Sequence, residues 1–460
     1  MNKKQIKNLL SEPIIWILFI GFIIRILMAS LQPIWIDEAS TWYVAKNTSY
    51  FNLILGKYNN EPHPPINYLL IKPLVSFFDT NAIAIRYFAI LTGSLLIPAV
   101  FYFAKMFLSN KRALLAAILT SISPILIWYS AEARPYIPAL LFCLLSLIFW
   151  EKYQKSTHDK YILMCCISML IALFISFSSI AIVLVLAIYY FNSKKKSLTF
   201  LSLVGTVLII YATWSANFFI NNGKTGLEET SWIGKPSWYE LFQFSIDSVY
   251  FRWQNYFYLN PYGIGMLSIL GIQLILLWEI IINKNIKRVY KDSYIKILAL
   301  LSPIVAIYSF SIFVKPIFLS RQILLSIIGL YYIVCLLEFR RLASKVLIAL
   351  LAVAMVGGNL WNLKVSKTQL NDYYFETICY NPKINTILTS NHVMYKYIDY
   401  LNNAGNCNLN LTIMQPSISI QDGECLIDVE ENIALPTINE SDYYKTYHSI
   451  DNEHIQIICK

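Results

Sequence analysis

The sequence predicts an all-α polytopic membrane bundle of about 11 transmembrane helices, followed by a small extracytoplasmic α+β domain. Of the 460 residues, 57% are hydrophobic and only 14% are charged, and the mean hydropathy is +0.52. Soluble domains carry about 25% charged residues, so composition alone indicates an integral membrane protein. Apolar stretches long enough to cross a hydrocarbon core of about 30 Å recur until residue 361 and then stop. We therefore expect a membrane domain over 1–361 and a second domain over 362–460.

The apolar stretches and the basic clusters between them together predict the topology. With Lys3, Lys4 and Lys7 in the cytoplasm, the later Lys and Arg clusters also fall inside, as the positive-inside rule requires. Since these short clusters serve topology, the net charge of +10 does not indicate nucleic-acid binding. We expect a multi-pass protein of the inner or plasma membrane, with a cytoplasmic N-terminus and an extracytoplasmic C-terminal domain. The expected spans are 14–31, 83–105, 112–128, 137–151, 161–177, 179–191, 198–219, 262–283, 294–313, 317–337 and 343–361.

The first outer loop, residues 32–82, is expected to hold two interfacial helices. One is a helix-like stretch from Ala39 to Leu55, and the other covers Pro64 to Phe78. The second stretch is short, begins with two prolines and contains Lys72, which favours a helix lying in the outer interface. If it crossed the membrane instead, every later assignment would be inverted.

The C-terminal stretch mixes short strand-like pieces, at 408–414 and 455–459, with a helical pattern at 393–401. This mixture predicts a small α+β domain. Four of the eight cysteines lie here, and they could form disulfides if the segment faces an oxidising compartment. Their pairing is left open; they are Cys379, Cys407, Cys425 and Cys459.

Two adjacent acids, Asp37 and Glu38, stand just beyond the first span. Carboxylates where a helix leaves the bilayer are costly unless water, a metal or a cation compensates them, which makes them candidates for chemistry. Further along the same loop, Glu61 and His63 precede two prolines that fix the backbone. Together with Asp37 they could bind a divalent metal ion through oxygen and imidazole ligands. The alternative is that Glu61 and His63 only cap the interfacial helix.

The outer end of the third span carries a second polar cluster, in the sequence from Trp128 to Tyr136. It contains Glu132 and, immediately before a proline, Arg134. An arginine beside the outer leaflet suits a phosphate group, because its planar fork makes bidentate contacts. Arg321 lies a few residues into the tenth expected span, where a charge is costly, so it needs a partner such as a protein carboxylate or a lipid phosphate. For each arginine the alternative is a structural ion pair.

Aromatic residues are abundant on the same expected face, among them Trp35, Trp42, Tyr43 and Tyr129. Aromatic side chains suit a sugar ring, arginines suit an anionic lipid headgroup, and acids suit the deprotonation of an acceptor. A lipid-linked sugar that meets its acceptor at the outer interface would use all three groups.

At three places the sequence resembles bacterial GT-C membrane glycosyltransferases of the protein O-mannosyltransferase and aminoarabinose transferase type (glycosyltransferase families 39 and 83). These are the Asp-Glu pair after the first span, the E-x-H-P-P motif at 61–65 and the S-x-E-x-R-x-Y turn at 130–136. The resemblance is diffuse over about 10–340 and does not cover the C-terminal stretch. It implies a helical bundle with two juxtamembrane helices in the first outer loop, polyprenyl-phosphate sugar donors, and inversion at the anomeric carbon. The acceptor would be a lipid, a glycan or a protein.

The resemblance also implies roles for individual residues. Asp37 matches the general base, Glu38 its orienting or metal-binding partner, and Glu132 a second functional carboxylate. Arg134 and Arg321 would hold the donor phosphate. The remaining substrate-binding candidates are Tyr136, Trp35 and Tyr43. The turn departs from many relatives in having Pro135 before Tyr136, which could shift Arg134 slightly.

Two other classes of function remain as alternatives. A transporter or flippase of lipid-linked sugars would require charges buried within spans and pseudo-symmetric halves. Most ionisable residues here lie at helix ends instead, Arg25 and Arg321 being partial exceptions, and no repeat is visible. An oligosaccharide polymerase or ligase would use a late outer loop rich in Arg and His, whereas the loop near 220–261 has only Lys224, Lys235 and Arg252.

Overall fold

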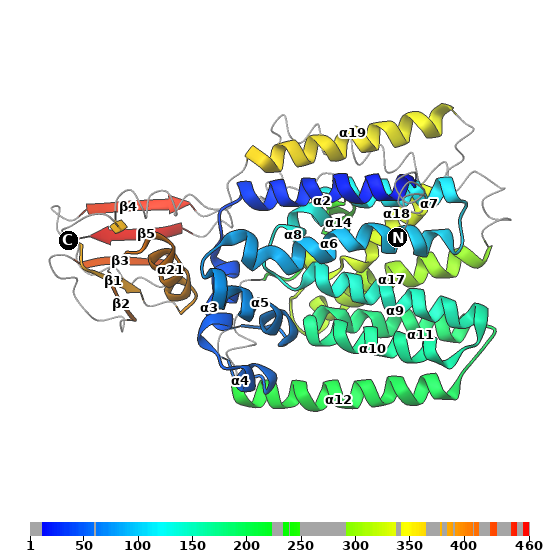
Figure 1. The fold of residues 1–460 in the computed structure, drawn as a ribbon, viewed down its shortest axis with the longest axis horizontal. Coiled ribbons are helices and arrows are strands. Elements are labelled where there is room, and N and C mark those ends of the chain that lie inside the picture. The colour runs from blue at the N-terminus through cyan, green and yellow to red at the C-terminus, as the bar shows by residue number, and fades with distance from the viewer. Residues whose placement is uncertain are drawn as a thin grey trace, which may run out of the picture.

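A computed structural model describes most of the chain. The described residues are 12–58, 61–222, 233–238, 240–248, 291–336, 342–364, 378–379, 384–389, 392–407, 409–413, 424–429, 443–448 and 454–459. A bundle of helices lies beside a smaller unit built on a sheet, and helix α3 (Ile36–Asn47) of the first loop lies between the two (Figure 1).

Helices of the bundle lie within the predicted spans that the structure describes, but several are too short to cross a membrane alone, and the helix in the expected span 317–337 covers only Leu325–Cys335. The helices of the bundle are α2 (Pro13–Leu31), α6 (Ala82–Lys105), α7 (Asn110–Ile122), α8 (Pro124–Ser130), α9 (Tyr136–Ser156), α10 (Asp159–Ile175), α11 (Ala181–Asn192), α12 (Leu198–Asn222), α14 (Glu240–Asp247), α17 (Lys291–Phe313), α18 (Leu325–Cys335) and α19 (Leu342–Lys364). In the part of the chain that the structure describes, five helices are long and apolar enough to cross a membrane, or six if α7 and α8 form one bent span. The chain is therefore a multi-pass membrane protein. The expected span 262–283 lies outside the described residues.

Local sequence signals explain where several helices begin. Pro13 occupies the first turn of α2, where a missing N–H costs nothing. The side chain of Asn81 accepts a hydrogen bond from the N–H of Ala84 and caps α6. At the centre of the bundle α6 contacts α2, α7 and α9, which places its middle turns in the largest hydrophobic core.

The first loop differs from the prediction in one respect. The expected helix from Ala39 to Leu55 is two helices, α3 (Ile36–Asn47) and α4 (Tyr50–Ile54). They separate at Thr48, whose backbone is extended, and Ser49 caps α4 by accepting from the N–H of Asn52. Because α3 starts at Ile36, the two acids lie in its first turn rather than before it. Negative charge there is stabilised by the helix dipole.

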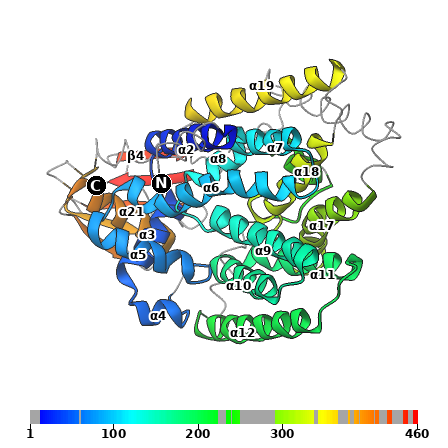
Figure 2. The ribbon, with the colours of Figure 1, turned by 45° about the vertical axis from the view of Figure 1, so that its right-hand side comes forward.

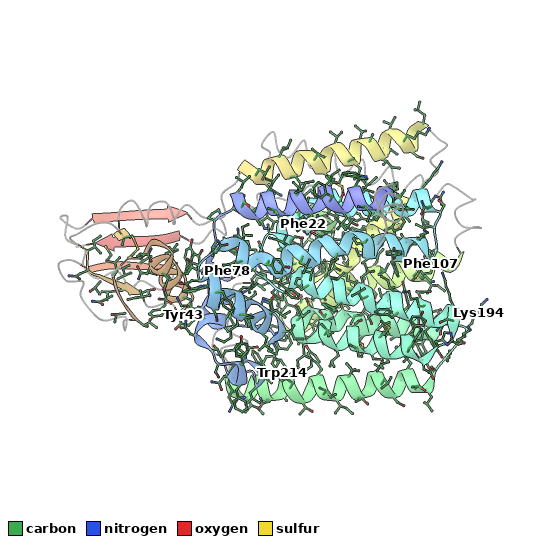
Figure 3. The ribbon with its side chains drawn as sticks, viewed as in Figure 1. Phe22, Tyr43, Phe78, Phe107, Lys194 and Trp214 are labelled. Carbon is green, nitrogen blue, oxygen red and sulfur yellow. A yellow bond between two sulfur atoms is a disulfide. The ribbon has the colours of Figure 1, made fainter. Side chains whose placement is uncertain are left out.

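Helix α5 (Ile66–Phe78) lies at the end of the bundle and contacts α3 and α6 (Figure 1). Its 13 residues extend about 20 Å at 1.5 Å per residue, which is too short for a hydrocarbon core of about 30 Å. This length fits the predicted interfacial helix. Figure 3 shows Tyr43 and Phe78 at this end of the bundle, next to the C-terminal unit, and Phe107 and Lys194 at the opposite end.

The C-terminal unit contains β1 (Thr386–Thr389), α21 (His392–Gly405), β2 (Asn410–Ile413), β3 (Glu424–Val429), β4 (Tyr443–His448) and β5 (His454–Cys459). The strand order is β2-β1-β3-β5-β4. Strand β1 is parallel to β2 and β3, and β5 is antiparallel to β3 and β4. Cys379 and Cys407 form a disulfide, and Cys425, also disulfide-bonded, lies opposite Cys459 in the register of β3 and β5.

Helix α21 packs directly on α3, as both ribbon views show (Figures 1 and 2). The ring of Trp42 meets that of Tyr400 edge to face at 5.3 Å, and Lys46 donates to the side chain of Asn403. The C-terminal unit and the first loop thus share one hydrophobic cluster. Helix α3 has this cluster on one side and the bundle on the other.

Candidate functional site

The two adjacent acids of α3 point into different environments. Glu38 is fully buried and forms a two-pronged ion pair with Arg86 of α6, with N–O distances of 2.6 and 2.7 Å. It also accepts from the N–H of Ala133 at 2.8 Å. The other donors of Arg86 bind the carbonyls at the end of α2 and just after it, those of Ala29, Gln32 and Pro33. Glu38 therefore joins α3, α6 and the turn at 131–135.

Arg134 lies in that turn, between α8 and α9, and is almost completely buried. Its Nη1 donates to the backbone carbonyl of Asp37 and to the hydroxyl of Thr41, both at 2.9 Å, and to Glu61 at 3.2 Å. Its Nη2 lies 2.8 Å from Nε2 of His63. Burial alone would lower the pKa of Arg134, but Glu61 and Asp37 raise it well above its usual value. The guanidinium is a permanent cation that connects α3 to the E-x-H-P-P segment.

The E-x-H-P-P segment is held from both sides. Tyr68 of α5 donates to the Glu61 carboxylate at 2.6 Å, and Tyr58 donates to the carbonyl of His63 at 2.7 Å. Burial, followed by the charges of Arg134 and Arg321, lowers the pKa of His63 well below its ordinary value. A neutral imidazole can accept at Nε2 from Arg134, which makes His63 a partner of that cation.

The predicted metal ligands Asp37, Glu61 and His63 do not gather around a common point. Within the described ranges, no group of three or more His, Cys, Asp or Glu side chains could hold a metal ion. Arg134 stands among the three predicted ligands and contacts each of them. This donor set does not fit a divalent cation as arranged.

Asp37 differs from its neighbours in being reachable, since 28% of its side chain is exposed. A single carboxylate oxygen, Oδ2, lies 3.8 Å from Arg134 and 3.7 Å from Arg321. The carboxylate is thus held between two cations, one in the buried turn and one at the edge of a cavity. A group in this position can receive a proton from a bound molecule.

The sequence predicted that Arg321 lies inside a helical span, but the structure places it before one. It belongs to the 3-10 turn η2 (Ser320–Gln322), and α18 begins only at Leu325. Its guanidinium carbon lies 5.6 Å from the centre of the Tyr136 ring. Both residues border a small, half-open cavity between α9, the start of α11 and η2, which is also lined by Ser178, Ser179 and Gln322.

The remaining predicted residues are distributed unevenly. Tyr136 belongs to the site, because its ring also meets that of His63 at 5.6 Å. Glu132 is fully buried in the turn beside Arg134. Trp35 is buried at the start of α3, and Tyr43 turns away toward the C-terminal unit, with its ring 6.2 Å from that of Tyr395. The structure therefore does not bring Tyr43 together with the arginines.

Sequence reasoning missed Arg86, which compensates Glu38, and Thr41 and Tyr68, which bind Arg134 and Glu61. Arg86 had a usable signal, because a cation in the first turns of an apolar span needs a partner. Thr41 and Tyr68 had no such signal in the sequence. Their role depends on how α3 and α5 pack.

Comparison with known proteins identifies the fold and the class of enzyme. Residues 62–216 match the sequence profile of the family described as dolichyl-phosphate-mannose-protein mannosyltransferase. The structure resembles that of ArnT from Cupriavidus metallidurans in the apo state, with a TM-score of 0.62, 12% identity, and coverage of 96% of this chain and 97% of that one. ArnT bound to undecaprenyl phosphate also gives a TM-score of 0.62, with 13% identity and the same coverage. No curated protein sequence matches significantly.

A more distant likeness is to the Archaeoglobus fulgidus oligosaccharyltransferase in the apo form. Here the TM-score is 0.50 and the identity 12%, over 86% of this chain and 64% of that one. The predicted resemblance to GT-C membrane glycosyltransferases is confirmed by the family match and the shared fold. The prediction of an enzyme rather than a transporter is confirmed with it.

Proposed function

We propose that this chain, a membrane glycosyltransferase that matches the protein mannosyltransferase family over residues 62–216, moves a sugar from a polyprenyl-phosphate donor to an acceptor at the outer face of the membrane. The observation that carries the proposal is the place of Asp37. Its side chain is partly exposed, its Oδ2 lies between Arg134 and Arg321, and Arg321 borders a cavity. The ArnT structure with undecaprenyl phosphate supports a lipid phosphate as the donor group.

The chemistry requires one base and a stabilised leaving group. An acceptor hydroxyl attacks the anomeric carbon of the sugar while the bond from that carbon to the phosphate oxygen breaks on the opposite face. Asp37 takes the hydroxyl proton, and the bonding electrons leave with the phosphate, so the anomeric configuration is inverted. No acid needs to protonate the leaving group, because a phosphate leaves as an anion.

The two arginines have different roles in this proposal. Arg134 is occupied by Thr41, Glu61 and His63, so it holds Asp37 in place. Arg321 borders the cavity beside Tyr136 and is the better group to bind the donor phosphate. There it would stabilise the negative charge that grows on the phosphate as the bond breaks. Glu132, buried next to Arg134, belongs to the electrostatic surroundings of the site rather than to the proton transfer.

The orientation proposed here follows the basic clusters, with about 11 spans, the N-terminus in the cytoplasm and residues 362–460 outside. The disulfide between Cys379 and Cys407 supports this orientation, because disulfides persist in oxidising compartments. The acceptor, which is a lipid, a glycan or a protein, would approach at the face where α3 meets the C-terminal unit.

The test is transfer by the purified protein from a panel of radiolabelled polyprenyl-phosphate sugars, with and without chelator. We expect one donor to lose its label, and Asp37→Asn to slow that loss by about 10²–10⁴-fold. The matched control is Asp79→Asn, which removes an exposed acid of the same outer region whose partner is Lys46. Retention of label from every donor would refute the proposed reaction, and a wild-type rate for Asp37→Asn would remove Asp37 as its base.

A further inference from the structure

The span formed by α7 and α8 is broken in the middle of the bundle. The two helices meet at 55°, and Pro124 begins the second. Proline has no N–H, so the carbonyl of Thr120 loses the donor that a continuous helix would supply four residues later. A break of this kind is tolerated inside a membrane protein only if other groups satisfy the freed carbonyls.

Arg25 of α2 supplies these donors. Its side chain is fully buried, and it donates to the carbonyl of Thr120 at 3.1 Å and to that of Ser121 at 3.3 Å. The next carbonyl, that of Ile122, accepts from Asn359 of α19 at 2.8 Å. A cation at this point is also favoured by the dipole of α7, whose C-terminal end it caps.

The same guanidinium reaches the other end of α8. Its Nε donates to the hydroxyl of Ser130, the last residue of that helix, at 3.2 Å. Two glycines leave room for this contact. A Cβ at Gly93 would clash with the Ser130 hydroxyl and lie 3.1 Å from Nε of Arg25, and one at Gly21 would lie 3.3 Å from Nη1 of Arg25. Arg25 therefore contacts the chain immediately before α8 and the final residue of α8.

Helix α8 leads directly into the turn that builds the site. The N–H of Ala133 in this turn binds Glu38, and the side chain of Arg134 binds the carbonyl of Asp37. The direction of α8 thus decides where Arg134 stands relative to Asp37.

We propose that Arg25 is a positioning residue of the transferase, which fixes the break between α7 and α8 and so places Arg134 against Asp37. The proposal rests on the proposed function for its kinetic consequence, although its geometric consequence can be measured separately. Arg25 touches neither the cavity nor Asp37. Its effect on the reaction is carried by α8.

The kinetic test uses Arg25→Met, Pro124→Ala and the double variant. Arg25→Met should lower kcat by about 10–100-fold, because displacements of about 1 Å in a catalytic site reach that size. The KM for the donor should change less than about threefold, since the cavity is lined by α9, α11, η2 and their neighbours and not by α8. Leu27→Ala, a lipid-facing change on the same helix, is the matched control and should leave kcat unchanged.

The double variant separates positioning from simple stability. Pro124→Ala returns an N–H to Thr120, so it should restore thermal stability that Arg25→Met removes. It does not restore the bend, and kcat should stay low. Recovery of both properties together would overturn the proposal, as would an Arg25→Met enzyme with wild-type kcat per folded molecule.

A pulsed-EPR measurement tests the geometry without any reaction. Spin labels replace two exposed residues, Lys111 on α7 and Lys152 on α9, whose helices are joined through α8 and the turn. We expect the distance distribution to shift or broaden in Arg25→Met and to be unchanged in Leu27→Ala. An unshifted distribution would overturn the positioning role even if no donor sugar were transferred, whereas a shifted distribution with no transfer by the wild type would refute only the proposed function.

Discussion

Conservative amide substitutions of Asp37 and Glu38 should have opposite consequences, although the two acids are neighbours in the sequence. Glu38 is fully buried against Arg86, whereas 28% of the Asp37 side chain is exposed. The site predicts that Asp37→Asn impairs the reaction and spares the fold. For Glu38→Gln it predicts mainly a loss of stability.

The magnitudes follow from these surroundings. The Asp37 ion pairs are 3.7 and 3.8 Å long and partly exposed, so removing the charge should cost at most about 1 kcal/mol of stability. Loss of a general base lowers the rate by about 10²–10⁴-fold, which is about 2.7–5.4 kcal/mol in activation free energy. Glutamine at position 38 turns an amide NH₂ toward Arg86, and breaking a buried ion pair costs about 3–5 kcal/mol of folding stability.

Single-turnover transfer and thermal unfolding, measured on the same detergent-purified preparations, distinguish these outcomes. Asp37→Asn should unfold near the wild-type temperature and transfer slowly, whereas Glu38→Gln should unfold well below it. Wild-type stability in Glu38→Gln would show that the ion pair with Arg86 does not hold α3 against α6. A folded Glu38→Gln enzyme with a defect as large as that of Asp37→Asn would move Glu38 into the proton transfer.

Three further predictions concern the surroundings of the site. Burial, Arg134 and Arg321 keep the folded His63 imidazole neutral, while His63 of the unfolded chain binds a proton below pH about 6.5. The wild type should therefore be about 1.4 kcal/mol less stable at pH 5.5 than at pH 7.5, as measured by thermal unfolding. An equal pH dependence in His63→Gln would contradict this. The Cys379–Cys407 disulfide joins residues 28 positions apart. Its reduction should lower the folding stability of the C-terminal unit by about 3–4 kcal/mol and speed the proteolysis of that unit. An unchanged proteolysis rate would show that the disulfide does not stabilise the unit. Arg321→Gln should raise the KM for the donor by at least about tenfold, because a charge-assisted hydrogen bond to phosphate contributes about 1.5–3 kcal/mol. An Arg321→Gln enzyme whose KM equals that of the wild type for every donor would exclude Arg321 as the phosphate ligand.

The sequence was sufficient to locate the longest helices because apolar length is a local property. Helix α6 runs from Ala82 to Lys105 where 83–105 was expected, and α12 from Leu198 to Asn222 where 198–219 was expected. The desolvation of about 20 consecutive side chains dominates any single contact, so tertiary packing does not move such a helix by more than a few residues. The motifs that carry the family resemblance were also visible at this level.

Shorter elements were less predictable, because single interactions decide their ends. The helix that carries Asp37 begins three residues earlier than expected, and Ser49 caps a separate α4. Arg321 lies in a 3-10 turn, although hydropathy extended the following helix over it. In each case a cap or a turn of a few residues overrides the average hydropathy of the window.

By itself the sequence determined that this chain crosses a membrane many times, and it predicted that acids and arginines gather at one face of that membrane. Only the tertiary structure decided which acid is fully buried and which is reachable. Glu38 finds its cation 48 residues away, and Arg134 takes the place among Asp37, Glu61 and His63 where a metal ion was expected. Charges in a low-dielectric interior are compensated by whichever partner the packing brings within about 3 Å, and that proximity is not encoded in any local stretch of the chain.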